Sequence, residues 1–501
     1  MTGPDVVVVG AGPVGLVAAA LLAAHGVRTL VLERFAAPYP LPRAVHVDDE
    51  VVRILQQLGL HDAFAAISRP AAGMRLLDAD HRVLAEFSRD TGEGQLGYPQ
   101  SNLFDQPELE KLLRDSVSGL DLVELRREVE VVGLDQGADV RVTYRDAYGT
   151  HQVSARAVLG CDGANSTVRR LIGSQLDDLH FEQRWLVVDV RCPVQLDVWG
   201  GVEQVCDPRR AATFMQVGGQ RYRWEFQMLP GENLADLTAP SVLGDLIRPW
   251  TRSVAAQHLQ VIRSAQYTFR ARLADRWRDG RVFLLGDAAH QTPPFVGQGL
   301  GAGMRDAQNL TWKLGSVVVH AASPVVLETY EAERKPVARQ VIRSAVLAGW
   351  AMTAGQGKAG MVRRRLLEAV SRAPGGTRLL ATTTTPRLPN GPLAQRTRGR
   401  HDPAGRPLPQ PWVIHRGERV RLDDVLGQGF AVVRDGPVDS QLAARVGALG
   451  TVVTVDVSDH PAAGVRAVQS PELSGWLRRA RARAVLVRPD RIVAVRVPDG
   501  T

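Results

Sequence analysis

Cysteine is scarce in this 501-residue chain, which has only three, Cys161, Cys192 and Cys206. They form no CxxC pair, and so small a number is typical of a reducing compartment rather than of a disulfide framework. We therefore expect a cytoplasmic protein in which the cysteines serve as small apolar residues.

Lysine is also rare. It occurs only at positions 111, 313, 335 and 358, although lysine and arginine together number 61. The net charge of +8 therefore comes from arginines spread along the chain. No helix-turn-helix, zinc-finger or aromatic-interleaved basic motif accompanies them, so we expect no nucleic-acid partner.

An unbroken hydrophobic segment is missing as well. The apolar run from Val6 to Ala24 is interrupted by glycines at 10, 12 and 15, with no basic stretch before it and no cleavage site after it. This pattern predicts neither a signal peptide nor a membrane span. The hydrophobic share of 45% and the charged share of 23% are typical of soluble globular proteins, and the length favours about two or three domains.

The first motif is a glycine-rich turn between a predicted strand, Val6–Val9, and a predicted helix, Leu16–Ala24. In Gly10-Ala-Gly12-Pro-Val-Gly15, the first glycine permits the turn, the second lets a pyrophosphate approach the backbone, and the third lets helix and strand pack closely. The helix N-terminus attracts phosphate. Glu33, after the second predicted strand, can accept hydrogen bonds from ribose hydroxyls. The combination predicts a dinucleotide site without separating FAD from NAD.

The second motif follows a predicted strand at 281–285. It reads Gly286-Asp287, then a proline–glycine loop that leads into a helix from about Gly299 to Leu314. An acid at a strand end far from the first motif suits a long ligand that needs a second anchor, and Asp287 is suited to hold the hydroxyls of a ribityl chain. Backbone N–H groups at the helix start favour the negative charge that reduction creates on a flavin ring. The alternative is a connection whose aspartate only caps the helix.

A third motif, Gly160-Cys161-Asp162-Gly163, follows the predicted strand 157–159. Its Asp-Gly pair forms turns readily, so taken alone it indicates only an ordinary loop.

In this order and at these separations, the three motifs resemble the single-component (class A) flavoprotein aromatic hydroxylases, the group that includes para-hydroxybenzoate hydroxylase. The resemblance spans about residues 5 to 345. It implies non-covalent FAD, NAD(P)H as a transient co-substrate, and O2. Cofactor contacts are then expected from Gly10, Ala11, Gly12, Pro13, Val14, Gly15, Glu33, Arg34, Arg43, Gln106, Val129, Asp162, Gly286, Asp287, Pro294, Gly297, Gly299, Leu300 and Gly301.

Shorter segments resemble one branch, the 3-(3-hydroxyphenyl)propionate hydroxylases: 42–50, 185–190, 206–210, 223–226 and 303–307. Two features depart from that branch. The loop at 299–303 lacks the Asn-Ser often found before its final glycine, and His46 stands where a smaller residue is common. Both lie near the expected flavin face, and related sequences also tailor polyketides and antibiotics, so the resemblance leaves the substrate open.

The resemblance implies an α/β fold with a Rossmann-like FAD-binding domain of the glutathione-reductase type, an inserted antiparallel β-sheet substrate domain, and a thioredoxin-like C-terminal domain. We predict the first at 1–70, 96–178 and 265–380, the second at 71–95 and 179–264, a linker at 381–410, and the third at 411–501. The C-terminal domain has no cysteine, which excludes a redox role and leaves a structural or oligomerisation role. A homodimer is left open.

The expected cycle is that NAD(P)H reduces FAD, O2 adds at the flavin C4a position, and the hydroperoxide hydroxylates a phenolic or polycyclic aromatic ring. No metal is required, and no metal-ligand spacing appears. Phenols react faster as phenolates, so a base or cation near the ring would help. The candidates are His46, Arg223, Trp224 and Glu225. A histidine base would make activity respond to pH near about 6.5, whereas the alternative for His46 is a packing role.

Other functions fit the same architecture. Epoxidases and Baeyer–Villiger oxygenases of natural-product tailoring remain alternatives, as does a non-catalytic flavin-binding protein. The lysine and Trp-x-Trp-x-x-Ile motif of flavin halogenases are not found at 185–265, which disfavours that class.

Overall fold

The computed structural model describes residues 3–38, 44–353, 385–397, 401–436, 441–457 and 465–498. Its first unit is a six-stranded sheet in the order β18-β19-β12-β1-β2-β8, with β18 antiparallel and the other strands parallel. The strands are β1 (Val6–Val9), β2 (Thr29–Glu33), β8 (Val123–Arg127), β12 (Ala157–Gly160), β18 (Arg278–Asp279) and β19 (Val282–Leu284).

Helices cover this sheet, which explains why its central strands are continuous apolar runs. The four valines of β1 are buried, and helix α1 (Pro13–Ala24) packs against α4 (Gln106–Ser118) and α8 (Gly299–Val319). The other helices of this part are α2 (Asp49–Gln57), α3 (His61–Ile67), α5 (Thr167–Leu171) and α9 (Thr329–Met352). The predicted helical region beyond residue 353 lies outside the described residues as far as residue 384.

The strand order brings the three motifs together. Strands β19, β12, β1 and β2 are neighbours and run parallel, so their carboxyl ends lie side by side at one edge of the sheet. Gly286, Cys161, Gly10 and Glu33 stand at or just beyond those ends. Ligands of open α/β sheets bind at this edge.

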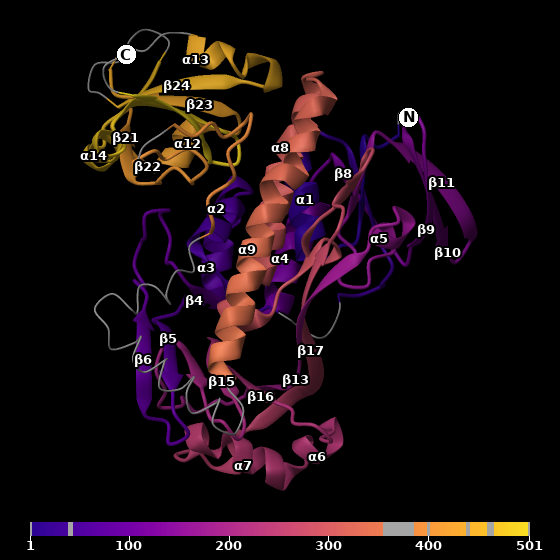
Figure 1. Ribbon diagram of the computed structural model, residues 1–501, viewed down its shortest axis with the longest axis vertical. Helices are drawn as coiled ribbons and strands as arrows, with labels where there is room; N and C mark the ends of the chain where they lie inside the picture. Colours follow the sequence, from indigo (N-terminus) through magenta and orange to yellow (C-terminus); the bar gives the residue numbers. More distant parts are fainter. Residues whose placement is uncertain are drawn as a thin grey trace.

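The second unit is an eight-stranded sheet in the order β20-β17-β13-β16-β15-β14-β5-β6, which forms the lower part of Figure 1. Helices α6 (Leu234–Thr238) and α7 (Pro240–Thr251) lie at the bottom edge of that view. The strands are β5 (Gly73–Leu77), β6 (Val83–Ser88), β13 (Leu176–Arg191), β14 (Val202–Val205), β15 (Ala212–Gly218), β16 (Arg221–Gln227), β17 (Gln260–Ala274) and β20 (His290–Gln291).

The long strands β13 and β17 extend beyond the predicted limits of the substrate domain. The predicted boundaries at 179 and 264 fall inside these two strands, because one continuous pair of strands links the two units. The domain division itself stays a prediction. Two small sheets complete this part: β3 (His46–Val47), β4 (Ser68–Pro70) and β7 (Asn102–Phe104), and β9 (Glu130–Gln136), β10 (Val140–Asp146) and β11 (Gly149–Ala155).

The C-terminal unit, yellow at the top of Figure 1, has a five-stranded mixed sheet in the order β25-β24-β23-β26-β27 and a hairpin of β21 and β22. A thioredoxin-like relationship for it stays a prediction. Its elements are β21 (Trp412–His415), β22 (Glu418–Arg421), α12 (Leu422–Leu426), β23 (Phe430–Arg434), α13 (Gln441–Ala444), β24 (Val452–Val457), β25 (Arg466–Val468), α14 (Pro471–Arg479), β26 (Ala482–Val487) and β27 (Val493–Pro498).

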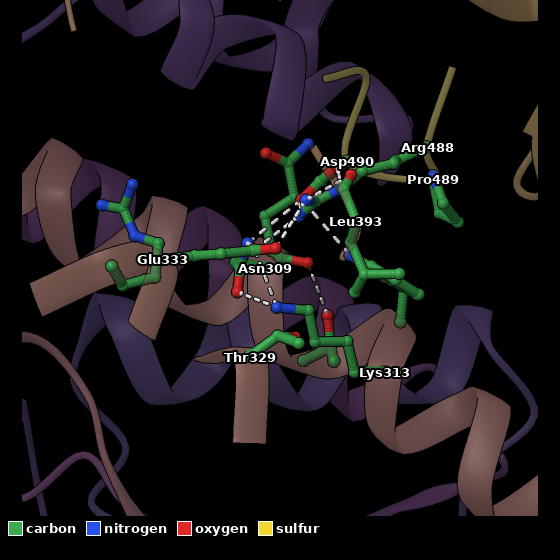
Figure 2. A network of polar contacts seen from close by, with 12 residues as sticks. Asn309, Lys313, Thr329, Glu333, Leu393, Arg488, Pro489 and Asp490 are labelled. Carbon is green, nitrogen blue, oxygen red and sulfur yellow. Dashed lines mark hydrogen bonds and ion pairs between the residues drawn. The ribbon is translucent and has the colours of Figure 1, made fainter. Parts of the chain in front are cut away.

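A buried polar network joins the C-terminal unit to α8 and α9 (Figure 2). Arg488 donates to both oxygens of Glu333 at 2.8 and 2.9 Å and to Asp490 at 3.0 and 2.5 Å. Lys313 donates to Glu333 and to Asn309, each at 2.8 Å. Each charge has opposite charge or hydrogen bonds at contact distance, as burial requires.

The same unit also contacts the segment 92–98, which follows β6. Gln410 is hydrogen-bonded to the Gln95 and Leu96 carbonyls, and Arg421 donates to Glu93 at 3.0 Å. The Arg421 guanidinium also lies 4.4 Å from the ring centroid of Tyr98. Within the described residues, no helix is long and apolar enough to cross a membrane.

Candidate active site

One cavity of about 900 Å³ runs from the glycine-rich turn to the face of the eight-stranded sheet. Its walls include Gly10–Val14 at one place and Gly286, Asp287 and the loop 294–300 at another. The two segments also touch, because a Cβ built on Gly286 would lie 3.2 Å from Val14 Cγ2. The volume is at the upper end of the range for ligand sites, roughly 300–1,000 Å³. The two predicted anchors therefore share one cavity.

The three glycines of the first motif have different surroundings. Gly10 has a φ of +100°, and a Cβ there would lie 2.6 Å from the Cys161 carbonyl oxygen. A Cβ on Gly15 would overlap the Gly10 carbonyl oxygen, so Gly15 permits the close packing of α1 on the turn. A Cβ on Gly12 would meet no atom of the described residues within 4 Å, and Gly12 lines the cavity at the start of α1. This open, cavity-facing backbone fits a pyrophosphate.

Glu33 lines the cavity and also organises the turn. Its Oε2 accepts from Ala11 N at 2.7 Å, and its Oε1 accepts from Phe35 N at 2.9 Å. A carboxylate has about four lone-pair sites, so these two bonds leave acceptor capacity for a ribose hydroxyl. The ribose contact stays a prediction, as do those of Arg34 and Val129, which line the same part of the cavity.

Gln106 and Asp162 line the cavity while their side chains bond to the protein. Gln106 accepts from Ala44 N at 2.7 Å and donates to Glu110 at 2.8 Å. Asp162 accepts from the Ser166 hydroxyl at 2.5 Å and from two backbone N–H groups at the start of α5. Its carboxylate therefore caps the short helix α5, and we expect a ligand in the cavity to contact mainly the backbone of this loop. Arg43, another predicted FAD contact, lies outside the described residues.

Behind the second motif lies an acid that the motif did not reveal. Asp306 on α8 is fully buried, accepts from Gly286 N at 3.2 Å, and pairs with His290 at 2.7 Å and Arg334 at 2.9 Å. Although burial alone would raise it, the interactions with His290 and Arg334 hold the pKa of Asp306 below its ordinary value. Asp306 thus fixes the backbone beside Asp287, which lines the cavity. It lies within the segment 303–307 that carried the branch resemblance.

The proline–glycine loop divides into cavity-facing and interior residues. Pro294, Gly297, Gly299 and Leu300 line the cavity. Gly301 does not, because its missing side chain would point at Arg305, 2.8 Å from Nη1. The predicted cofactor contacts of Gly301 and Gly15 stay predictions, although neither residue lines the cavity.

His46 connects two walls of the cavity. Its Nδ1 lies 3.1 Å from the Gly297 carbonyl oxygen, and its Nε2 lies 2.9 Å from the Ser101 hydroxyl. Because a carbonyl only accepts, Nδ1 carries the proton and Nε2 accepts from Ser101. Burial lowers the pKa of His46 below its ordinary value, although Gly297 and Asp48 oppose the shift. The neutral ring is thus engaged at both nitrogens, which favours a positioning role over that of a base.

The alternation of β16 divides the other three catalytic candidates between the two faces of the sheet. Arg223 and Glu225 line the cavity. Trp224 points the other way and is fully buried with Phe214 and Trp250, 5.1 and 6.5 Å away between ring centroids. The catalytic role of Trp224 stays a prediction, which its position away from the cavity does not favour. Trp224 packs instead in the hydrophobic core between the sheet and α7, which carries Trp250.

Arg223 belongs to a charged row across three strands. Asp189 on β13 stands opposite Arg223 on β16 and opposite Arg263 on β17. Arg223 donates to both Asp189 oxygens, at 2.8 and 3.1 Å, and Arg263 also pairs with Asp189. Although burial alone would raise it, these arginines hold the pKa of Asp189 below its ordinary value. Asp189 and Arg263 were not predicted, since only the strand register brings them to Arg223.

Comparison with known proteins assigns the family. Residues 4–345 match the family described as FAD binding domain, and residues 405–500 match the HcaD C-terminal domain. The chain therefore belongs to the FAD-binding domain family, and within it to the FAD-dependent aromatic hydroxylases. The predicted resemblance, the α/β FAD-binding fold and the cofactor are confirmed.

Two relatives show how close the similarity is. The chain is 34% identical over 443 residues to a probable NADH-specific resorcinol 4-hydroxylase of Rhodococcus jostii (strain RHA1), covering 86% of this chain and 79% of the relative. It is 33% identical over 519 residues to a 3-(3-hydroxy-phenyl)propionate/3-hydroxycinnamic acid hydroxylase 2 of Burkholderia vietnamiensis (strain G4 / LMG 22486), covering 98% and 93%.

Solved structures match over nearly the whole chain. A ternary complex of aklavinone-11 hydroxylase with FAD and aklavinone has a TM-score of 0.79 at 25% identity, over 99% of this chain and 96% of that one. The anhydrotetracycline hydroxylase OxyS of Streptomyces rimosus has a TM-score of 0.77 at 27% identity, with the same coverage.

Proposed function

We propose that this chain uses NAD(P)H and O2 to hydroxylate a phenolic or polycyclic aromatic substrate held against the eight-stranded sheet. One observation carries the proposal: the cavity that begins at the pyrophosphate turn continues without interruption to Arg223 and Glu225 on the sheet. A cofactor bound at Gly12 and Gly286 would thus occupy the same cavity as a second, smaller molecule.

The residues present fit FAD. Gly12 and the N-terminus of α1 would receive the pyrophosphate, Glu33 the ribose, Asp287 the ribityl chain, and the loop 294–300 the flavin ring. Bound FAD supplies the redox chemistry with NAD(P)H and O2. What the protein adds is position and the exclusion of water.

The far wall of the cavity suits a flat apolar ring. It includes aromatic and aliphatic side chains from the sheet, the loop 294–300 and α9, and the burial of an aromatic face against such a wall favours binding. The residues are Met74, Leu76, Phe87, Val187, Val202, Met215, Phe269, Phe295, Ala348 and Met352.

The names of relatives and of structural neighbours point to a substrate class. Relatives are named for resorcinol and for 3-(3-hydroxyphenyl)propionate, and a structural neighbour holds aklavinone. These share a hydroxylated aromatic ring, which we propose as the substrate class. We also propose a cytoplasmic location, supported by three cysteines that are all free.

The test is turnover by the purified protein. We expect it to contain FAD and to oxidise NADH or NADPH faster when resorcinol, 3-(3-hydroxyphenyl)propionate or aklavinone is added. Under 18O2, the product should carry one labelled oxygen. A yellow protein that is silent toward every aromatic compound would favour a non-catalytic flavin-binding role, and a product with an oxygen inserted into a C–C bond would indicate Baeyer–Villiger chemistry.

A further inference from the structure

A single carboxylate on the floor of the cavity stands out from the other charged groups. Glu225 on β16 lines the cavity, and its side chain is 11% exposed. Among the residues that the structure describes, no hydrogen bond to this carboxylate is found. Its ion-pair partner is Arg223, whose Nη1 lies 3.9 Å from Oε1, beyond hydrogen-bond distance. A buried carboxylate without a hydrogen bond lowers the stability of the fold unless a ligand supplies a hydrogen-bond donor.

Arg223 does not satisfy Glu225, because it is held by another acid. Its Nε and Nη2 donate to the two oxygens of Asp189. The two arginines on the sheet farther along the cavity wall also face acids of their own: Arg270 pairs with Glu182 at 2.9 Å and Arg272 with Asp178 at 3.5 Å. Among the described residues, Glu225 therefore differs from these arginines in having no partner closer than Arg223 Nη1 at 3.9 Å.

The charges around Glu225 show what it can do. Arg223, Arg263 and Asp189 together carry one net positive charge, which the ionised Glu225 balances. If a hydroxyl gives its proton to Glu225, the negative charge moves to the new oxyanion and the balance is unchanged. The same arginines then stabilise the product of the transfer. Tyr267 on β17 is a further titratable side chain in the wall.

We propose that Glu225 binds the phenolic hydroxyl of the substrate and removes its proton. The O–H bond of the phenol breaks, the proton goes to a Glu225 oxygen, and the electron pair stays on the phenolate oxygen, so no other reactant is needed. The inference rests on the proposed function and names its substrate class: aromatic rings with an ionisable hydroxyl. Thr213 stands opposite Glu225 on β15 and donates to Gln204 at 2.8 Å, so a polar strip continues across the floor.

Burial supports this assignment. It raises the pKa of Glu225 above that of an ordinary glutamate, while Arg223 opposes the shift. A higher pKa makes the carboxylate a stronger base toward a phenol, whose own pKa is about 10. Activity that needs the ionised carboxylate should fall as the pH falls through this raised pKa.

The experiment compares Glu225→Gln with a matched control, Glu203→Gln. Glu203 is on β14 of the same sheet, which β15 separates from β16, but it accepts a hydrogen bond from Trp250 Nε1 at 2.8 Å and does not line the cavity. With the best substrate among resorcinol, 3-(3-hydroxyphenyl)propionate and aklavinone, we expect Glu225→Gln to lower kcat/KM by about 100-fold or more and to lose the acid limb of the pH profile. Glu225→Asp should recover part of the rate, and Glu203→Gln should match wild type. FAD content and melting temperature report on the fold.

Each outcome bears on a different claim. A Glu225→Gln variant within about threefold of wild type, with an unchanged pH profile, overturns the role of Glu225 and leaves the proposed function intact. Wild-type protein that makes no hydroxylated product from any of the three compounds overturns both. Wild type alone gives a second measurement if the variant does not fold: it should reject the fully O-methylated form of its substrate by about 100-fold or more. Equal turnover of the phenol and its ether overturns the inference.

Discussion

Gly12 and Gly15 allow the cofactor site to be separated from the stability of the fold. Both glycines belong to the same turn, yet a methyl group at Gly12 would meet no atom of the described residues within 4 Å, whereas one at Gly15 would overlap the Gly10 carbonyl. Gly12 has a φ of −72°, which alanine also adopts. Gly12→Ala should therefore leave the FAD-free protein as stable as wild type.

The expected loss in FAD affinity follows because the methyl group would keep the pyrophosphate away from the backbone at position 12. If the methyl group keeps one phosphate oxygen from a backbone N–H, the loss of that charge-assisted hydrogen bond costs about 1.5–3 kcal/mol. This corresponds to roughly 10- to 150-fold in Kd. For Gly15→Ala, we expect instead a loss of about 1–3 kcal/mol in the free energy of unfolding, because α1 must move away from the turn.

The assay uses FAD-free protein prepared from both variants and from wild type. FAD is titrated by the quenching of its fluorescence, and urea unfolding of the FAD-free forms gives their stability. Wild-type FAD affinity in Gly12→Ala would refute the placement of the pyrophosphate at this turn. Equal destabilisation by both substitutions would refute the distinction between open and packed glycines.

Three further predictions test the surroundings of the cavity. His46→Gln should lower turnover by less than about 10-fold and keep the pH profile, since both ring nitrogens are used within the protein; a variant whose pH profile loses its acid limb would show a base instead. Glu333→Gln should lower the free energy of unfolding by about 3–5 kcal/mol, measured by urea, whereas Asp115→Asn at an exposed pair should cost under about 1 kcal/mol. Although burial alone would raise it, Arg488 and Lys313 hold the pKa of Glu333 below the ordinary 4.5. The stabilisation by Glu333 should therefore be full at neutral pH and be lost as the pH falls below that value. A Glu333→Gln variant as acid-sensitive as wild type would contradict this. Arg421→Met should raise NAD(P)H oxidation without product by a few-fold, and coupling equal to wild type would argue against a link between segment 92–98 and the cavity.

The dinucleotide half of the site could be predicted from local sequence because its residues act through the backbone. Gly10, Gly12 and Gly286 stand at strand ends, and parallel strands bring their ends to one edge whatever the rest of the chain does. The FAD-binding family and α/β fold were therefore accessible from motifs alone. Whether the residues that line the cavity contact FAD stays a prediction.

The substrate half was less accessible because its chemistry depends on strand register. Residues 223–226 fall on β16, but a period of two decides which side chains face the cavity, so Trp224 was grouped with Arg223 and Glu225 although it points to the opposite face. Asp189 lies 34 positions from Arg223 and 74 positions from Arg263 in the sequence. The three residues meet because β13 pairs with both β16 and β17. Such pairs carry no short-range signal.

The contacts of the C-terminal unit with residues 92–98 give that unit a part in shaping the reaction chamber. This segment leads within a few positions to Gln100 and Ser101, which line the cavity, and Ser101 is the partner of His46. The C-terminal unit is thus linked to this part of the cavity wall through the segment 92–98. We therefore expect fusions or truncations at this end of the chain to raise NAD(P)H oxidation without hydroxylated product.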